Sequence, residues 1–279
     1  MGIFDKLKKK GNVTTVEEVE PTHKWDLSAE IAILRDEKYV VKNDFKNKEY
    51  YLDRLMANNK FLNDITERYE LGTLYEPERY PRLVQRELID VIHFLYVVGA
   101  RYEVVKKYVI EYLLLLEKED IEHWGYSKEA MALALAYLYD VEAETIARIE
   151  LKYQQTQEKY VDAVLDIFRN KIFHNKVSTT KEFYFKDKGV FGDYELGHGE
   201  LIEAIQAENP QERSKKFVEY LEKVKEKHYK NLLSHYEKIG ENRYSYGGAQ
   251  CFKLTALAKM LEVDKEEIAN SRFIANDLL

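Results

Sequence analysis

The stretch RNKIFH, Arg169 to His174, holds the pair of residues in this chain that is best suited to catalysis. Arg169 precedes His174 by five positions, so both side chains belong to one short segment. A histidine can take a proton from a ribose 2′-hydroxyl, and an arginine can stabilise the negative charge on the scissile phosphate. The pair therefore indicates RNA cleavage as one candidate chemistry.

The Arg169–His174 spacing resembles the active-site motif of the HEPN ribonucleases, which are small helical bundles. The resemblance implies that Arg169 and His174 are catalytic residues. The alternative is that the motif is the end of a helix, with Arg169 in solvent and His174 near the negative end of the helix dipole. We favour the second interpretation, because a pattern this short arises by chance in a chain with 7 histidines.

The other common patterns of catalytic and metal-binding residues are missing from the sequence. The histidines form no HExxH motif, and the single cysteine, Cys251, cannot form a Cys-x-x-Cys zinc site. A P-loop, a GxGxxG loop and a GxSxG motif are also missing. We therefore predict a protein that is not an enzyme and that uses no metal and no cofactor.

The composition favours an all-α fold. The chain has only 4 prolines and 12 glycines, and 33% of its residues are charged. Apolar residues recur at helical spacing, as at Tyr51, Leu55, Phe61, Leu62, Ile65 and Tyr69. We predict helices at 44–69, 81–98, 102–116, 128–139, 141–153, 158–169, 210–239 and 249–263.

The predicted helices form a multi-helix bundle of two packed helical units. One long loop or small hairpin at about 176–199 interrupts them, because this stretch combines four glycines with alternating aromatic residues. We divide the chain into a mobile N-terminal lead-in (1–24), an N-terminal helical domain (25–124) and a C-terminal helical domain (125–279).

Helix boundaries are marked by several local signals. We predict that Gly72 ends one helix and that Pro81 opens the next. Helix-capping residues are predicted from their types and positions, namely Ser127, Asp140, Asn209 before Pro210, and Asp264 in a capping box with Glu267.

The overall charge limits the classes of partner. A net charge of −7 argues against nonspecific nucleic-acid binding and against binding to an anionic membrane. We find no apolar run of membrane-span length and no signal-peptide core, and a single cysteine fits a reducing compartment. We therefore expect a cytoplasmic protein that contacts neither nucleic acid nor membrane.

The negative charge is concentrated in the middle of the chain. Residues 111–166 hold 13 acidic and 5 basic residues, so this segment carries −8 and the remainder of the chain +1. Acidic residues at helix junctions and aromatic residues in the 176–199 loop are suited to binding a basic protein partner. The predicted partner-binding residues are Glu119, Asp120, Glu122, Asp140, Glu142 and Glu144 at the junctions and Tyr184, Phe185, Asp187, Asp193, Tyr194 and Glu195 in the loop.

The C-terminal stretch YGGAQCFKLTALAKMLEVDKEEIANSRFIANDLL resembles the C-terminal domain of the PoNi immunity proteins. NDFKNKEYYLDRLMANNKFLNDI is similar to the opening of the family's N-terminal domain, and MALALAYLYDVEAETIARI to its central helix pair. The resemblance covers roughly Asp44 to Leu279. The residues that fit the C-terminal pattern are Gly248, Phe252, Ala256, Leu257, Lys259, Leu261, Asp264, Asp277 and Leu278.

The resemblance implies a function in competition between bacteria. PoNi proteins protect bacteria against PoNe-type polymorphic nuclease toxins. The resemblance therefore implies that this chain binds and neutralises a cognate secreted nuclease toxin, expected to be a DNase, by protein–protein contact without catalysis. It carries no catalytic residue over to this chain, and it assigns no oligomeric state.

Overall fold

The computed structural model describes residues 25–42, 47–119, 126–154, 163–177, 199–224, 251–271 and 273–279. All regular structure in these ranges is helical, which confirms the predicted all-α class. The α-helices are α1 (Ser28–Leu34), α2 (Lys48–Glu70), α3 (Tyr80–Val97), α4 (Tyr102–Lys118), α5 (Tyr126–Leu138), α6 (Ala143–Gln154), α7 (Ala163–His174), α8 (Gly199–Gln206), α9 (Pro210–Val224), α11 (Phe252–Met260) and α12 (Lys265–Ile268). Two 3-10 helices, η2 (Pro77–Arg79) and η5 (Asn276–Leu278), complete the set.

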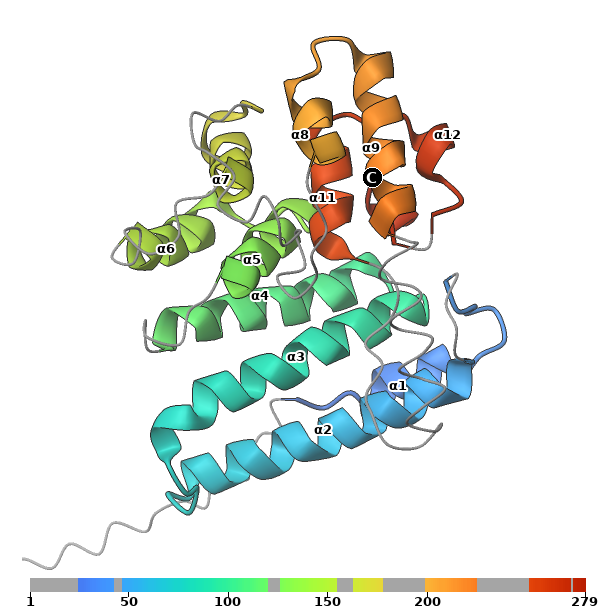
Figure 1. The fold of residues 1–279 in the computed structure, drawn as a ribbon. Helices are drawn as coiled ribbons and strands as arrows, with labels where there is room; N and C mark the ends of the chain where they lie inside the picture. The colour runs from blue at the N-terminus through green and yellow to red at the C-terminus, as the bar shows by residue number, and fades with distance from the viewer. Residues whose placement is uncertain are drawn as a thin grey trace, which may run out of the picture.

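The first three long helices form one layer. Figure 1 shows α2, α3 and α4 stacked in succession, and α3 packs against both of its neighbours. The apolar stripe of α2 faces this layer, with Tyr51, Leu55, Leu62 and Ile65 buried as their spacing predicts. Phe61 and Tyr69, which the same spacing includes, are instead 37% and 44% exposed. Consecutive helices that are joined by short loops pack side by side and run antiparallel. The order of α2, α3 and α4 in the chain therefore places them in one layer.

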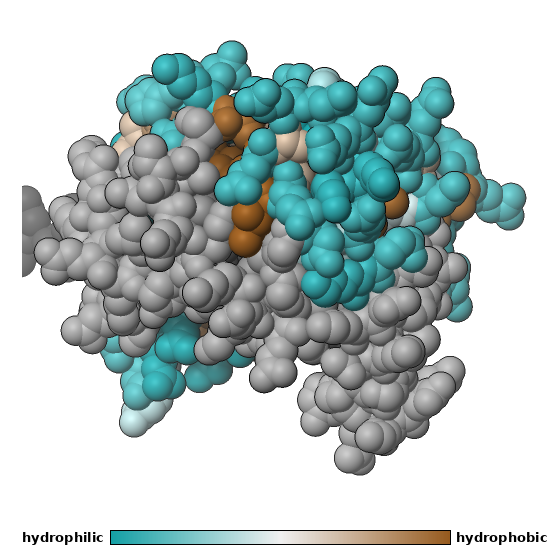
Figure 2. All heavy atoms as spheres, turned by 45° about the horizontal axis from the view of Figure 1, so that its top comes forward, coloured by the Kyte–Doolittle hydropathy of each residue, from teal (hydrophilic) through white to brown (hydrophobic). Residues whose placement is uncertain are grey.

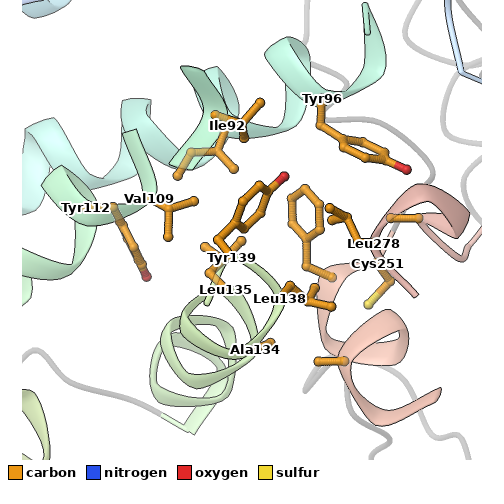
Figure 3. Close-up of a cluster of buried hydrophobic side chains, with 14 of the residues drawn as sticks. Ile92, Tyr96, Val109, Tyr112, Ala134, Leu135, Leu138, Tyr139, Cys251 and Leu278 are labelled. Carbon is orange, nitrogen blue, oxygen red and sulfur yellow. The ribbon is translucent and has the colours of Figure 1, made fainter. Parts of the chain in front are cut away.

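Helix α11 lies in the middle of the molecule. It packs along α5, and every residue from Phe252 to Ala258 is buried. The Phe252 ring stacks on His93 of α3 with centroids 4.5 Å apart and meets Tyr96 edge-on at 5.6 Å. Figure 3 shows side chains of α3, α4 and α5 converging with Cys251 and Leu278 in this cluster. The uniformly apolar sequence of α11 is thus explained by neighbours on several sides.

A segment before α2 and the C-terminal segment also meet at this cluster. The Lys42 ammonium lies 2.7 Å from the Asp277 carboxylate and 4.1 Å from the centre of the Tyr96 ring. The backbone N–H of Cys251 donates to the carbonyl of Phe273 at 2.8 Å. Residues from both predicted helical units therefore share one core, while the boundary at 124–125 lies outside the described residues and stays a prediction.

Two of the predicted N-caps are confirmed. Asn209 caps α9, since its side chain accepts from the N–H of Gln211 at 2.8 Å. Asp264 caps α12 by accepting from the N–H of Glu266, but its own N–H donates to the Ser214 hydroxyl at 2.9 Å. The predicted capping box is therefore wrong, because α9 supplies the acceptor that Glu267 was expected to provide.

The cap predictions at Ser127 and Asp140 are wrong. Helix α5 already begins at Tyr126, so Ser127 lies inside its first turn. Asp140 instead follows the end of α5 in the left-handed conformation, with φ 44°. The N–H of Val141 closes the turn by donating to the carbonyl of Ala136 at 3.0 Å. Gly72, with φ 66°, ends α2 in the same way, as predicted.

The seam between α2 and α3 contains a carboxylate whose titration affects stability. Burial, reinforced by the nearby Glu87, raises the pKa of Asp90 from 3.8 to about 6, although Arg54 and Arg86 oppose this shift. Because the unfolded chain releases this proton first, Asp90 makes the protein less stable as the pH rises from about 4 to 6.

We expect Asp90→Asn to stabilise the protein at pH 7 by on the order of 1–3 kcal/mol. The variant should also remove the fall in stability between about pH 4 and 6. Urea denaturation at pH 4, 5, 6 and 7 measures both effects. Asp64→Asn is the control, since an exposed carboxylate contributes little to the change of stability with pH. Equal pH profiles for wild type and Asp90→Asn would contradict the expectation.

Candidate partner-binding surface

The acidic residues predicted for partner binding do not all reach the surface. Glu119, at the end of α4, is only 3% exposed. Both of its carboxylate oxygens accept from the Lys128 ammonium at 2.7 Å. The prediction that Glu119 faces a partner is therefore wrong, because an ion pair to α5 holds the side chain inside the bundle.

Part of the predicted surface cannot be placed. Asp120 and Glu122 lie outside the described residues, as do the predicted loop residues Tyr184, Phe185, Asp187, Asp193, Tyr194 and Glu195. At the ends of the predicted 176–199 segment, Lys176 and Val177 are non-helical and Gly199 already begins α8. These eight residues stay predictions.

The turn between α5 and α6 does present its acidic residues to solvent. Asp140, Glu142 and Glu144 are all exposed. The backbone carbonyl of Asp140 accepts from the Lys106 ammonium at 3.0 Å, which fixes the turn against α4. The carbonyl of Glu142 accepts from the N–H of Ile146 at 3.3 Å, and the buried side chain of Ile146 anchors α6.

Two tyrosines flank this turn. The Tyr102 hydroxyl donates to Oδ2 of Asp140 at 3.4 Å, and its ring stacks on the buried Tyr139 at 5.2 Å. Burial, together with the charge of Asp140, raises the pKa of Tyr102 to about 12. Burial and the charges of Asp140 and Glu262 also raise the pKa of Tyr137. Both hydroxyls therefore stay protonated and can donate hydrogen bonds at neutral pH.

Sequence reasoning missed part of this surface. Besides the three predicted acids, it contains Tyr102, Glu103, Tyr137 and Glu262, which come from α4, α5 and the end of α11. We call these seven residues together the acidic–tyrosine surface. Lys106 and Lys259 lie beside the Tyr102 and Tyr137 rings, so five carboxylates face two ammonium groups. Such a surface suits a basic protein partner, with tyrosines as contact residues.

The RNA-cleavage pair is not assembled into one site. Arg169 and His174 both lie on α7. Because five residues of an α-helix rotate the side-chain direction by about 140° beyond a full turn, the two side chains point in different directions. His174 is exposed at the last position of the helix, as the favoured interpretation predicts. Arg169 is not in solvent, contrary to that interpretation, since its guanidinium pairs with the buried Glu129. A guanidinium held by this carboxylate is poorly placed to bind a phosphate.

Among the residues that the structure describes, no three histidine, cysteine, aspartate or glutamate side chains come together as a metal site. None of the helices in the described ranges is long and apolar enough to cross a lipid bilayer.

Comparison with known proteins gives one match. Residues 195–278 match the family model described as PoNe immunity proteins (PoNi), C-terminal. The matched residues include α8, α9, α11, α12 and η5. The match confirms the resemblance that the C-terminal sequence indicates. No curated protein and no solved structure matches the chain.

Proposed function

We propose, from the match of residues 195–278 to the PoNe immunity (PoNi) family, that this protein is an immunity protein. It binds a cognate PoNe-type nuclease toxin, expected to be a DNase, and neutralises it by protein–protein contact without catalysis. A DNase toxin reaches its substrate in the cytoplasm of the cell that it attacks, so a cytoplasmic location of the immunity protein belongs to the same proposal.

The matched residues form a tightly connected part of the core, which supports their use as a scaffold. Arg213 of α9 donates to the carbonyl of Ala207, after α8, at 2.9 Å and to the carbonyl of Leu261, after α11, at 3.1 Å. One guanidinium thereby joins the C-terminal ends of two helices, where a positive charge is favourable. A rigid scaffold reduces the entropy that binding costs.

The acidic–tyrosine surface supports the proposed partner. A nuclease that holds DNA presents positive charge to the phosphates, and five exposed carboxylates complement that charge. Tyr102 and Tyr137 supply large, rigid contact area with hydroxyl donors. Blocking such a cleft requires no catalytic group on the inhibitor.

The proposal is tested by neutralisation. Co-expression with its cognate PoNe-type nuclease toxin should restore growth, and the purified protein should inhibit DNA cleavage by that nuclease domain at equimolar ratio. Growth arrest and unchanged cleavage in the presence of folded protein would refute it. Release of nucleotides from RNA by this protein alone, lost in His174→Ala, would instead support the ribonuclease alternative.

Reversing charge on the acidic–tyrosine surface should slow binding. We expect Glu142→Lys with Glu144→Lys to reduce the association rate about ten-fold at low salt and to weaken its salt dependence. Stopped-flow kinetics with the nuclease domain measures both. The matched control is Glu266→Lys with Glu267→Lys, which makes the same charge change in the first turn of α12. Equal rates for the two double variants would place the interface elsewhere.

A further inference from the structure

The turn that connects α2 to α3 carries three exposed apolar side chains. Tyr69 is 44%, Leu71 69% and Tyr75 82% exposed, and we call these three residues the hairpin-end surface. Figure 1 shows this turn at the lower left, at the opposite end of the hairpin from the side that faces α11. Exposed apolar side chains that cluster in this way mark interaction sites more often than scattered ones do.

The large apolar side chains that are exposed in the described ranges all lie between Ile33 and Tyr102. None of them falls in the matched residues 195–278. In the view of Figure 2, which brings the top of Figure 1 forward, the described surface is mostly hydrophilic with small apolar areas. Among the described residues, the exposed large apolar side chains thus lie outside the part of the chain that the family model matches.

The backbone holds the hairpin-end surface in one conformation. The carbonyl of Arg68 accepts from the N–H groups of Thr73 and Leu74 at 2.8 and 3.0 Å. Glu76 follows Tyr75 in the left-handed conformation, with φ 57° and ψ 67°, and directly precedes Pro77. This conformation is unfavourable for a residue with a β-carbon, and the Arg79 guanidinium supports it by pairing with the Glu76 carboxylate at 2.8 Å.

The base of the turn is anchored in the core. The Tyr69 ring stacks on Tyr80 with centroids 4.1 Å apart. The Tyr80 hydroxyl lies 3.1 Å from the Thr66 hydroxyl, which accepts from the Trp25 indole N–H at 2.8 Å. Trp25 is fully buried. An exposed aromatic surface on so rigid a support loses little entropy when a partner covers it.

The composition around the turn is that of a protein interface. From residue 61 to 105 the chain contains no lysine, although it has five arginines there, at 68, 79, 82, 86 and 101. Tyrosine and arginine are enriched in the centres of protein interfaces, whereas lysine is depleted. The rim carries the exposed Glu67, Glu70 and Glu78, which form no ion pair with described residues.

We propose that the hairpin-end surface is a second contact site for the cognate nuclease toxin, separate from the acidic–tyrosine surface, with Tyr75 and Leu71 as its main contact residues. This inference rests on the proposed function and names a surface outside the matched residues. The occupant is a basic protein surface with an apolar depression, because among the described residues near the turn three exposed carboxylates form no ion pair, against one exposed guanidinium, that of Arg82.

The test measures binding of the full chain to a catalytically inactive form of the PoNe-type nuclease domain that the protein neutralises. We expect Tyr75→Ser and Leu71→Ser each to raise the dissociation rate at least about ten-fold, with an unchanged melting temperature, since both side chains are exposed. The matched control is Val40→Ser, which removes a side chain that is 70% exposed but lies away from the turn. Its rate should stay within about two-fold of wild type.

Each other outcome overturns the proposal in a distinguishable way. If the wild type binds and both variants dissociate at the wild-type rate, the toxin does not contact this surface, while the immunity function stands. If the wild type itself fails to bind, the immunity function falls together with the inference. If sedimentation reveals a dimer that Tyr75→Ser converts to monomers, the surface joins two copies of this chain instead.

Discussion

Phe252→Ala should lower the free energy of unfolding by about 3–5 kcal/mol, because it opens a cavity where the two halves of the molecule meet. The Phe252 side chain is fully buried and contacts His93 and Tyr96 of α3. Its ring also meets Tyr139, which directly follows α5, with centroids 6.4 Å apart. Replacing it removes contacts on both sides of the cluster, and few neighbours can move to fill the space.

Urea denaturation followed by far-UV circular dichroism and by tyrosine fluorescence measures this loss. The control is Phe61→Ala. The Phe61 side chain is 37% exposed, so its replacement should lower the free energy of unfolding by about 1 kcal/mol or less. Both probes should report one transition for the wild type, since residues of both halves share the cluster. A loss below about 1 kcal/mol for Phe252→Ala would show that the cluster contributes little to stability.

Arg169→Met should also cost about 3–5 kcal/mol, because it removes the guanidinium that pairs with the buried Glu129 carboxylate. The two side chains are 16% and 5% exposed, and the pair joins α7 to α5. Replacing both partners, as in Arg169→Met with Glu129→Leu, should recover most of the lost stability, since no buried charge remains.

The control for this pair is Arg148→Met, which breaks the ion pair with Glu117 between α6 and α4. The Arg148 side chain is 52% exposed, so we expect a cost of about 1 kcal/mol or less. Equal melting temperatures for Arg169→Met and Arg148→Met would contradict a structural function for Arg169. His174→Ala, at an exposed helix end, should change neither the stability nor the binding of the nuclease domain.

Arg169→Met and its combination with Glu129→Leu also distinguish the structural from the catalytic interpretation of the RNKIFH stretch. If Arg169 is structural, Arg169→Met loses toxin neutralisation only as far as it loses folded protein, and the double variant with Glu129→Leu regains it. If Arg169 were catalytic, the double variant would still fail to neutralise the toxin although it folds. Folded protein is measured by circular dichroism in the same samples.

The sequence by itself determined the all-α class and the position of most helices. Apolar spacing identified the buried face of α2. Asn209 and Asp264 are predicted to cap the starts of helices and Gly72 to end one, and the structure confirms all three. These features are local, because the 3.6-residue period and the hydrogen bonds of a cap involve residues only a few positions apart. The same locality made the C-terminal family pattern recognisable.

Only the tertiary structure decided which charged residues face solvent. Glu119 looks in sequence like any other acid at a helix junction, yet Lys128 of the next helix holds it inside the bundle. Arg169 was expected in solvent, and its partner Glu129 lies 40 positions earlier in the chain. A buried ion pair leaves no periodic signal, since either residue alone is typical of an exposed helix face.

The tertiary structure also decided which residues share a surface. Tyr102 and Asp140 meet across 38 positions, and Glu262 approaches the same turn from the end of α11. The hairpin-end surface depends in the same way on the Tyr69–Tyr80 stack and on the left-handed Glu76. Periodicity specifies the face that a helix buries, but the packing of helices distant in sequence specifies which exposed side chains become neighbours.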